Sequence, residues 1–547
     1  MFEIDDIFSI IALILFIASI LGMLAIKLKQ PLIVSFIAVG IILGPSSLGW
    51  VTVNDQLDLL AKLGISLLLF IVGLKLDLHI IRTMGAVALA TGIGQVLFTS
   101  LFGYLIALLL NFDQLEAIYI AVALTFSSTI IIVKLLSDKR EVDSLHGRIA
   151  IGFLIVQDLL VIVAMIVLNA LSGAKVPGTI GPNVLSILFN GFIFVVIVGL
   201  LMRYLLTRLL NMLAQSKELL LLFSIAWAVS LGALGHYMGF SKEVGAFVAG
   251  VSLASTPYRD VLGARLVGLR DFLLLFFFVD LGATLDLSAV AGQFSEALLF
   301  SLFVLVGNPL IVMIIMGVMG YRKRTGFLAG LTVAQISEFS LILGALGVSL
   351  GHINADILGV ITLVGLITIS ASTYMILYSQ GLYQKLLPLL GIFEKKRPNR
   401  EMLSSQQGTN ESFDIIVFGL GRFGRTLVNV FMFKGYSVLA VDFDPEAVRR
   451  AKLTGMEARY GDAEDEEFIA MLPLQNTKWV IGAMHDKYIS QTLSQHLHEI
   501  GYSGKSAFTV HDKYNVEKIT RHGAVLIMVH EYAAQHAAQQ LIKLDAM

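Results

Sequence analysis

Residues 149–168 read IAIGFLIVQDLLVIVAMIVL, an apolar run in which only Gln157 and Asp158 carry polar side chains. A transmembrane helix needs about 20 consecutive, mostly apolar residues. A charge at the bilayer centre costs at least about 2.5–3.5 kcal/mol on insertion scales, so an ionisable side chain there usually faces an interior cavity. The run therefore predicts a membrane-spanning helix with one deeply placed carboxyl group.

The same apolar character extends over most of the chain. Of the 547 residues, 56% are hydrophobic and only 14% are charged, against about 25% charged in soluble domains. Because the last quarter has an ordinary soluble composition, we predict a membrane domain over 1–384, a linker over 385–412 and a soluble domain over 413–547. The formal net charge of -1 gives no reason to expect a nucleic-acid partner, and the lack of cysteine excludes disulfides and thiolate metal sites.

Apolar runs separated by short polar breaks predict about 13 spans. They lie near 7–27, 31–49, 57–76, 85–110, 115–136, 147–172, 184–208, 218–238, 241–257, 264–284, 296–320, 325–350 and 354–380. Alternate loops are rich in Lys and Arg, such as the loop with Arg322, Lys323 and Arg324, and the intervening loops hold almost none. The positive-inside rule then places the N-terminus outside and the C-terminal domain in the cytoplasm. We expect a multi-pass protein surrounded by the lipid of the bacterial inner membrane.

Two pairs of segments repeat at a spacing of about 210 residues, a self-similarity that indicates internal symmetry. FIAVGIIL at 36–43 matches AFVAGVSL at 246–253, and Gly73 in GLKLDL matches Gly282 in GATLDL. The members of each pair lie an odd number of spans apart. This arrangement predicts two halves of inverted topology, with a binding site at their interface.

The same spacing places the polar runs TFSST at 125–129 and QISEFS at 335–340 in corresponding spans. Hydroxyl groups can bond to a locally unwound backbone, and unwound backbone at membrane depth is tolerated only inside protein or beside a cavity. We therefore predict two broken helices; small packing residues are the alternative. The predicted fold class is a polytopic α-helical membrane domain with inverted repeats and two broken helices, followed by an α/β Rossmann-like domain.

Asp158 is the centre of the predicted membrane site. Because burial favours the neutral form of a carboxyl group, Asp158 can hold either a proton or a monovalent cation such as K⁺ or Na⁺, but not both. That competition couples the two fluxes if the site opens alternately to the two sides. We expect neutral oxygen ligands from Gln157, Thr125 and Ser128, and Glu338 either joins the proton path or forms a structural pair. A purely structural, protonated Asp158 is the alternative.

The soluble domain opens with a nucleotide-binding pattern. GLGRFG at 419–424 follows an apolar strand at 414–418, begins a helix, and is followed about 20 residues later by Asp442 at the end of a second strand. The glycines permit a tight turn, close approach of phosphate and close helix packing, and Asp442 is expected to hold ribose hydroxyls. The predicted nucleotide-binding residues are Gly419, Gly421, Arg422, Phe423, Gly424, Asp442 and Asp462.

Strands near 478–483, 506–510 and 524–528 continue the pattern, and 531–545 predicts a final amphipathic helix that could pack on a twin domain. No second, substrate-binding domain follows the motif. We therefore expect the nucleotide to be a sensed ligand and the chain not to be an enzyme. An empty groove is the alternative.

The Gln157-Asp158 pair, the run Gln335-Ile-Ser-Glu338-Phe and the glycine motif with Asp442 resemble Kef-type members of the second monovalent cation:proton antiporter family. In that family an exchanger is joined to a regulator-of-potassium-conductance domain of the TrkA-N type. The resemblance covers nearly all of the chain. It implies potassium/proton antiport, a homodimer with core and dimerisation helices, and an adenine nucleotide, AMP or NAD(H), as the regulatory ligand.

Two departures limit what the resemblance implies. Related antiporters often carry a lysine near the position of Asn308, so with a single aspartate we predict electroneutral, one-for-one exchange. The loop 258–265 lacks the acidic stretch of glutathione-gated Kef proteins, so glutathione gating is not expected, and another small cytosolic effector stays open as a partner. The residues also leave open the choice between K⁺ and Na⁺ and the role of Asp280. The alternative function is a nucleotide-gated potassium efflux channel, which would need a filter of the TVGYG kind.

Overall fold

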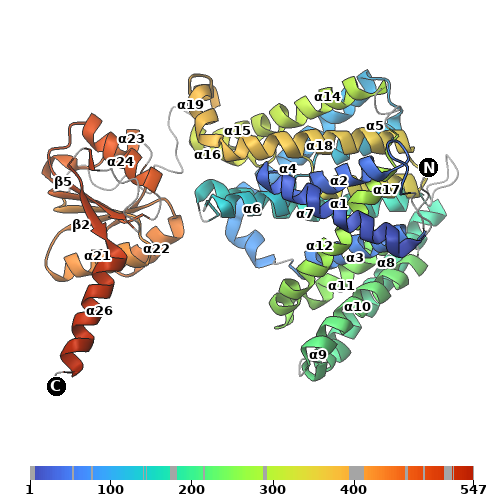
Figure 1. The fold of residues 1–547 in the computed structure, drawn as a ribbon, viewed down its shortest axis with the longest axis horizontal. Helices are drawn as coiled ribbons and strands as arrows, with labels where there is room; N and C mark the ends of the chain where they lie inside the picture. The colour runs from blue at the N-terminus through green and yellow to red at the C-terminus, as the bar shows by residue number, and fades with distance from the viewer. Residues whose placement is uncertain are drawn as a thin grey trace. The chain divides into compact units, whose positions relative to one another are not determined.

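The computed structural model describes the chain except for residues 1–5, 52–54, 76–77, 140, 143, 173–180, 214–215, 239, 287–291, 394–411, 462, 464–465, 485–486, 511–519, 522 and 546–547. Two compact units are formed: the helices up to Phe393, and the sheet and helices of the C-terminal domain (Figure 1). Each unit is described by itself. A helix, α19, covers the start of the segment predicted as a linker, and most of the remainder of that segment lies outside the described residues.

The first unit is all-helical, as the apolar runs predict. Its elements are α1 (Ile7–Lys27), α2 (Leu32–Leu43), α3 (Asp55–Leu74), α4 (Leu78–Leu109), α5 (Gln114–Ala123), α6 (Thr129–Asp138), α7 (Leu145–Ser172), α8 (Gly181–Leu201), η1 (Met202–Leu206), α9 (Thr207–Leu213), α10 (Lys217–Tyr237), α11 (Lys242–Ala254), α12 (Arg259–Ala283), α14 (Phe294–Leu302), η2 (Phe303–Gly307), α15 (Asn308–Val318), α16 (Lys323–Leu331), α17 (Glu338–Ser349), α18 (Ala355–Leu377), α19 (Ser379–Leu390) and η3 (Gly391–Phe393). The turns η1 and η2 are π-helical and continue the helices on either side of them.

Seven of the described helices are long and apolar enough to cross a membrane by length and composition. Among them are α1, α7 and α18, and shorter apolar helices such as α2 and α17 accompany them. The chain is therefore a multi-pass membrane protein. The total of about 13 spans stays a prediction.

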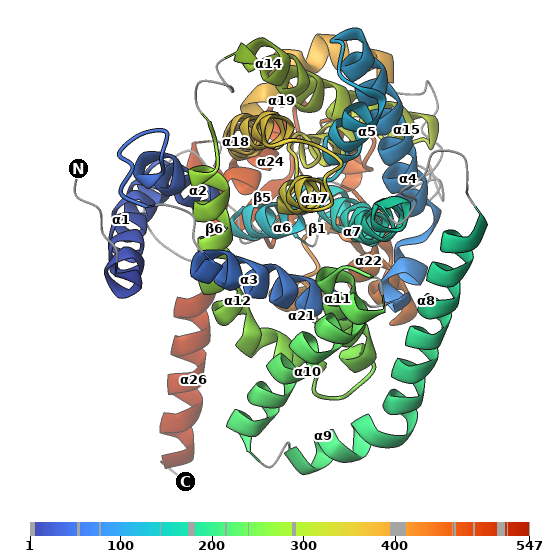
Figure 2. The same ribbon diagram turned by 90° about the vertical axis from the view of Figure 1, so that its right-hand side faces the viewer.

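The helices form two groups, which Figure 2 shows side by side. We call α4–α7 and α14–α18 the site bundle, in which α4 packs on α5 and α15, and α18 on α14 and α17. We call α1–α3 and α8–α12 the crossing bundle, in which α3 packs on α11 and α12, and α2 on α1 and α12.

Two spans of the site bundle are broken, as predicted. Helix α5 ends at Ala123 and α6 begins at Thr129, and α16 ends at Leu331 and α17 begins at Glu338. A serine caps the helix that follows each break. The Ser128 hydroxyl accepts a hydrogen bond from a backbone N–H of α6, and the Ser337 hydroxyl accepts one from a backbone N–H of α17. Such caps satisfy amide groups that a helix start leaves free.

The repeated glycines meet in the crossing bundle. Gly40 of α2 lies against Gly282 of α12, and Gly250 of α11 lies against Gly73 of α3. A Cβ atom added to Gly40 would lie 2.1 Å from a carbonyl oxygen of α12, and one added to Gly250 would lie 2.0 Å from a carbonyl oxygen of α3. Each half of the repeat therefore contributes one partner to two equivalent crossings, at which only glycine lets the backbones approach.

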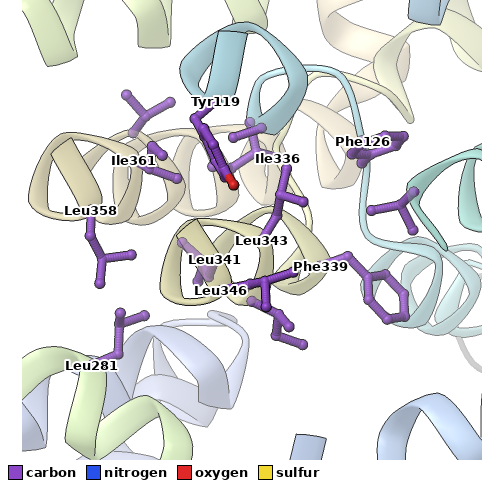
Figure 3. Close-up of a cluster of buried hydrophobic side chains, with 14 of the residues drawn as sticks. Tyr119, Phe126, Leu281, Ile336, Phe339, Leu341, Leu343, Leu346, Leu358 and Ile361 are labelled. Atoms are coloured by element: carbon purple, nitrogen blue, oxygen red, sulfur yellow. The ribbon is translucent and has the colours of Figure 1, made fainter. Parts of the chain in front are cut away.

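Large apolar side chains fix the broken helices in the site bundle. Tyr119 of α5 is fully buried in one cluster with Ile336, Leu343 and Ile361. Figure 3 shows Tyr119 beside Ile336 and Ile361, with α17 below them. Because these side chains come from α5, α17, α18 and the second break, they position one unwound segment relative to the rest of the bundle.

The C-terminal domain is an α/β domain. Its elements are β1 (Ile415–Phe418), α21 (Arg422–Phe433), β2 (Val438–Asp442), α22 (Pro445–Leu453), β3 (Ala458–Tyr460), α23 (Glu466–Ala470), η4 (Leu474–Asn476), β4 (Trp479–Gly482), α24 (Lys487–Glu499), β5 (Lys505–Val510), β6 (Val525–Met528) and α26 (Val529–Asp545). The six strands are parallel in the order β3-β2-β1-β4-β5-β6. This is the doubly wound order, with a ligand crevice at the carboxyl ends of β1 and β4. The Rossmann-like fold predicted for this domain is thus confirmed.

Candidate functional site

Asp158 of α7 lies against the start of the half-helix α6. The hydroxyl group of Thr129, the first residue of α6, donates a hydrogen bond of 2.9 Å to Asp158 Oδ2. The free amides at a helix N-terminus carry partial positive charge, which favours an anionic group nearby. The break in the fifth predicted span therefore provides a polar, electropositive wall for the carboxyl group.

Glu338 begins the second half of the other broken helix, the place that Thr129 holds in the first. It is the first residue of α17, its side chain is 1% exposed, and the Ser337 hydroxyl lies 3.4 Å from its Oε2 atom. The carboxyl groups of Asp158 and Glu338 are close enough to interact electrostatically. The structure thus places Asp158 beside the start of α6 and Glu338 at the start of α17, with the two carboxyl groups near each other.

The amide of Gln157 is held on both sides. Its Oε1 atom accepts a hydrogen bond of 3.2 Å from the Ser127 backbone N–H, and its Nε2 atom donates one of 2.6 Å to Gln95 Oε1. The Thr125 hydroxyl donates to the Ala121 carbonyl at 2.8 Å and lies 3.0 Å from the Ser100 hydroxyl. Of the predicted oxygen ligands, Gln157 therefore contacts the first unwound segment, and Thr125 lies in it.

Three buried side chains that the sequence analysis did not assign to the site continue this arrangement. The Thr99 hydroxyl of α4 donates a hydrogen bond of 2.7 Å to Asn308 Oδ1. The Asn308 amide nitrogen lies 3.5 Å from the Leu124 carbonyl and 3.2 Å from the Val333 carbonyl. Gln95, the third, bonds to Thr99 Oγ1 at 3.1 Å. A sequence signal exists for two of them, because Gln95 and Thr99 are polar residues four positions apart and therefore lie on one face of α4.

Asp280, whose role the sequence left open, lies in the crossing bundle. This residue of α12 interacts electrostatically with Asp58 and Lys62 of α3. Its Oδ1 atom is buried and has no hydrogen-bond partner among the described residues. No described contact joins it to Asp158.

The glycine motif of the C-terminal domain forms a tight turn between β1 and α21, which we call the cradle. Gly419 has a left-handed φ of 94°, which favours glycine. A Cβ atom on Gly424 would lie 1.8 Å from the Gly419 carbonyl oxygen, whereas Gly421, the cap of α21, has nothing within 4 Å of its Cβ position. The close-packed and open glycines fit a pyrophosphate approaching the helix N-terminus, where Arg422 and Phe423 begin α21.

Asp442 ends β2 beside this cradle. Its carboxylate accepts hydrogen bonds from the backbone N–H groups of Leu420 and, at 2.7 Å, Asp444. Burial raises the pKa of the Asp442 carboxyl group above its ordinary value, and the two amide hydrogen bonds act in the opposite direction. Asp442 thus lies at the carboxyl end of β2, next to the glycine turn, and its role toward a ribose stays a prediction. Asp462, the remaining predicted residue, lies outside the described residues.

Comparison with known protein families agrees with both parts of the chain. The family described as sodium/hydrogen exchanger, transmembrane, matches residues 12–377. The chain belongs to the sodium/hydrogen exchanger family. The C-terminal part of this exchanger, residues 415–530, matches the TrkA-N domain.

The chain is similar to several proteins named as antiporters or efflux systems. The exchanger is 27% identical to the putative cation/proton antiporter YbaL of Escherichia coli, over 87% of this chain and 86% of that protein. It is 26% identical to the glutathione-regulated potassium-efflux system protein KefC of Salmonella schwarzengrund, over 87% and 75% of the two chains. The sodium proton antiporter MjNhaP1 of Methanocaldococcus jannaschii has a similar fold, with a TM-score of 0.51 and 18% identity, over 70% of this chain and 98% of that one.

Within the exchanger, the two broken helices make one polar site. The Ser127 hydroxyl lies 3.4 Å from the Val333 carbonyl, so the two unwound segments touch each other directly. Freed backbone groups, two carboxyl groups and several amides converge there inside an apolar bundle. Such a site can bind a small ion or a proton.

Proposed function

We propose that the chain is an antiporter that exchanges a monovalent cation, preferably K⁺, for a proton at Asp158. The observation that carries this proposal is the Asp158 carboxylate facing the Thr129 hydroxyl at the start of a broken helix, with the Glu338 carboxyl group nearby. A partly dehydrated cation and a proton compete for such a carboxylate. The names of the similar antiporters support exchange, and the potassium-efflux relative favours K⁺.

We expect the exchange to be electroneutral. Asn308, which is fully buried beside the crossing of the broken helices, contributes no charge to the site. With one carboxylate that alternates between a proton and a monovalent cation, the charge carried is the same in both directions. Glu338 does not change this balance if it keeps one protonation state through the cycle.

Flux measurements in liposomes test this function. A proton gradient is imposed, K⁺, Na⁺ or choline is added, and internal pH and membrane potential are followed together. We expect K⁺ to dissipate the gradient faster than Na⁺, choline to have no effect, and the potential to stay flat. A membrane current proportional to transport would contradict electroneutral exchange, and K⁺ movement without protons would instead indicate a channel.

We further propose that an adenine nucleotide, AMP or NAD(H), binds the C-terminal domain in the cytoplasm and regulates transport of a homodimer. The cradle of Gly419, Gly421 and Gly424 can take the phosphate of AMP or the pyrophosphate of NAD(H), and the Asp442 carboxylate disfavours a 2′-phosphate. A ligand changes the balance of transport states only through its different affinities for them.

Replacing Asp442 with Asn is expected to weaken binding of NAD and AMP by about tenfold or more, because a charge-assisted hydrogen bond to the ribose is lost. Binding to the full-length protein in detergent is measured by calorimetry. Asp414→Asn is the matched control, since Asp414 pairs with Lys478 at the opposite end of the sheet. Burial raises the pKa of Asp442. On acidification, the nucleotide affinity of the wild-type protein should therefore begin to fall at a higher pH than it would with an aspartate of ordinary pKa. Equal affinities of the two variants would rule out this role of Asp442.

A further inference from the structure

A continuous chain of hydrogen bonds runs from Gln157, the neighbour of Asp158, to the second broken helix. Gln157 donates to Gln95 at 2.6 Å, Gln95 donates to Thr99 at 3.1 Å, and Thr99 donates to Asn308 at 2.7 Å. Asn308 in turn donates to the Val333 carbonyl at 3.2 Å. All four side chains are fully buried. We call Gln157, Gln95, Thr99 and Asn308 the amide chain.

The amide chain bonds to backbone groups that the two breaks leave free. Gln95 donates 3.1 Å to the Thr125 carbonyl, and Asn308 lies 3.5 Å from the Leu124 carbonyl. At the other end, Gln157 accepts from the Ser127 N–H. Free backbone groups in hydrocarbon surroundings are costly unless they find hydrogen-bond partners. The chain therefore connects the unwound segments of both broken helices.

The direction of every bond in the chain is mutually consistent. Each amide oxygen accepts from the preceding member and each amide nitrogen donates to the following one, so turning one amide over would place two donors face to face. Thr99 is the midpoint, because its single hydroxyl group accepts from Gln95 and donates to Asn308. Removing that hydroxyl interrupts the chain at one atom.

We infer that Thr99, with Gln95 and Asn308, is a positioning residue that sets the cation affinity of the site by holding the two unwound segments at a fixed separation. The inference rests on the proposed antiport function. A cation must be held by several oxygens at fixed distances, whereas a proton needs only the carboxyl group. Loosening the segments therefore weakens cation binding more than proton binding.

The test compares Thr99→Val, which has nearly the same shape and no hydroxyl, with Thr99→Ser, which restores the hydroxyl. Thr362→Val is the matched control, because Thr362 is also fully buried but its hydroxyl donates only to the Leu358 carbonyl of its own helix, at 2.7 Å. Exchange is measured in liposomes as a function of K⁺ concentration. For Thr99→Val we expect the KM for K⁺ to rise about tenfold, the scale of one or two hydrogen bonds, with a nearly unchanged maximal rate. Thr99→Ser and Thr362→Val should keep the wild-type KM.

A purely structural role predicts a different result. It would lower the amount of active protein, and hence the maximal rate, without moving the KM; an unchanged KM for Thr99→Val overturns the inference. If Thr99→Val is too slow for kinetics, K⁺ binding is measured in detergent through the rise in melting temperature that K⁺ causes. The midpoint is the K⁺ concentration that gives half of this rise. An unshifted midpoint there also overturns it. If wild-type protein exchanges no cations, the proposed function fails, and the same binding midpoint still tests the amide chain.

Discussion

The Asp158→Asn variant is expected to fold normally and to lose cation/proton exchange by about 100-fold or more, the scale on which losing a proton-transferring group acts. Asparagine has nearly the same shape, and its oxygen can still accept the hydrogen bond that Thr129 donates to Asp158. It can neither bind a transported proton nor balance the charge of a cation. The loss of exchange therefore comes from the missing carboxyl group, and the packing of α7 stays intact.

Glu338→Gln is the matched control for this substitution. It makes the same change from carboxyl to amide at the other buried carboxyl group of the site, at the start of α17 next to Ser337. Both variants are reconstituted at equal protein density, and exchange is followed by internal pH after addition of K⁺. We expect a smaller loss for Glu338→Gln. An Asp158→Asn variant that exchanges at the wild-type rate would show that another group carries the proton.

The second large effect is expected at the close helix crossings. In Gly250→Ala the new methyl group would lie 2.0 Å from the Phe70 carbonyl oxygen and 2.8 Å from the Leu74 nitrogen. Both are backbone atoms of α3, so neither can move aside without separating the two helices. We expect destabilisation by about 3 kcal/mol or more, at the upper end for overpacking. Gly40→Ala should behave alike, because its crossing with α12 is equivalent.

Melting of the detergent-solubilised protein, followed by the loss of the monodisperse chromatographic peak, measures this effect. Gly199→Ala on α8 is the control, because nothing lies within 4 Å of its added Cβ atom. If Gly250→Ala melts at the same temperature as Gly199→Ala, α3 and α11 can separate at little cost in stability. The tight crossing would then not be a rigid element of the fold.

Much of this architecture could be predicted from the sequence, because membranes restrict what a chain can do. The sequence repeat matched Gly40 to Gly250 and Gly73 to Gly282, and the matching polar runs predicted both broken helices. The repeat could not show that Gly40 meets Gly282 and Gly250 meets Gly73. Equivalent positions share an environment, but which of them touch depends on how the two halves pack.

The candidate site was predictable only in part, for a related reason. Asp158 and Glu338 stand out because charge is rare in apolar helices. Thr129, which donates to Asp158, appeared in the sequence only as the last residue of a polar run. The Gln95–Thr99 pair shares one face of α4 and Asn308 stands alone on another helix, but all three side chains are neutral, and neutral polar residues in a span most often serve packing. Their connection to each other through Thr99 exists only after the helices are assembled.

The predicted nucleotide site, unlike the membrane site, could be located almost entirely from the sequence. The glycines and Asp442 all lie in one local strand–helix–strand unit, β1–α21–β2, so sequence alone predicts their relative positions. The left-handed Gly419 and the contact between Gly424 and Gly419 agree with the expected turn. What the local motif does not specify is the ligand, because the adenine and its substituents lie beyond the glycine turn.

The most direct test of the account is the release of protons when K⁺ binds to detergent-solubilised protein in weakly buffered solution. If a cation and a proton compete for the Asp158 carboxyl group, K⁺ should release about one proton per chain from the wild-type protein when the free site is protonated. The Asp158→Asn protein should release none. K⁺ binding without proton release, or the same release from Asp158→Asn, would contradict competition at Asp158.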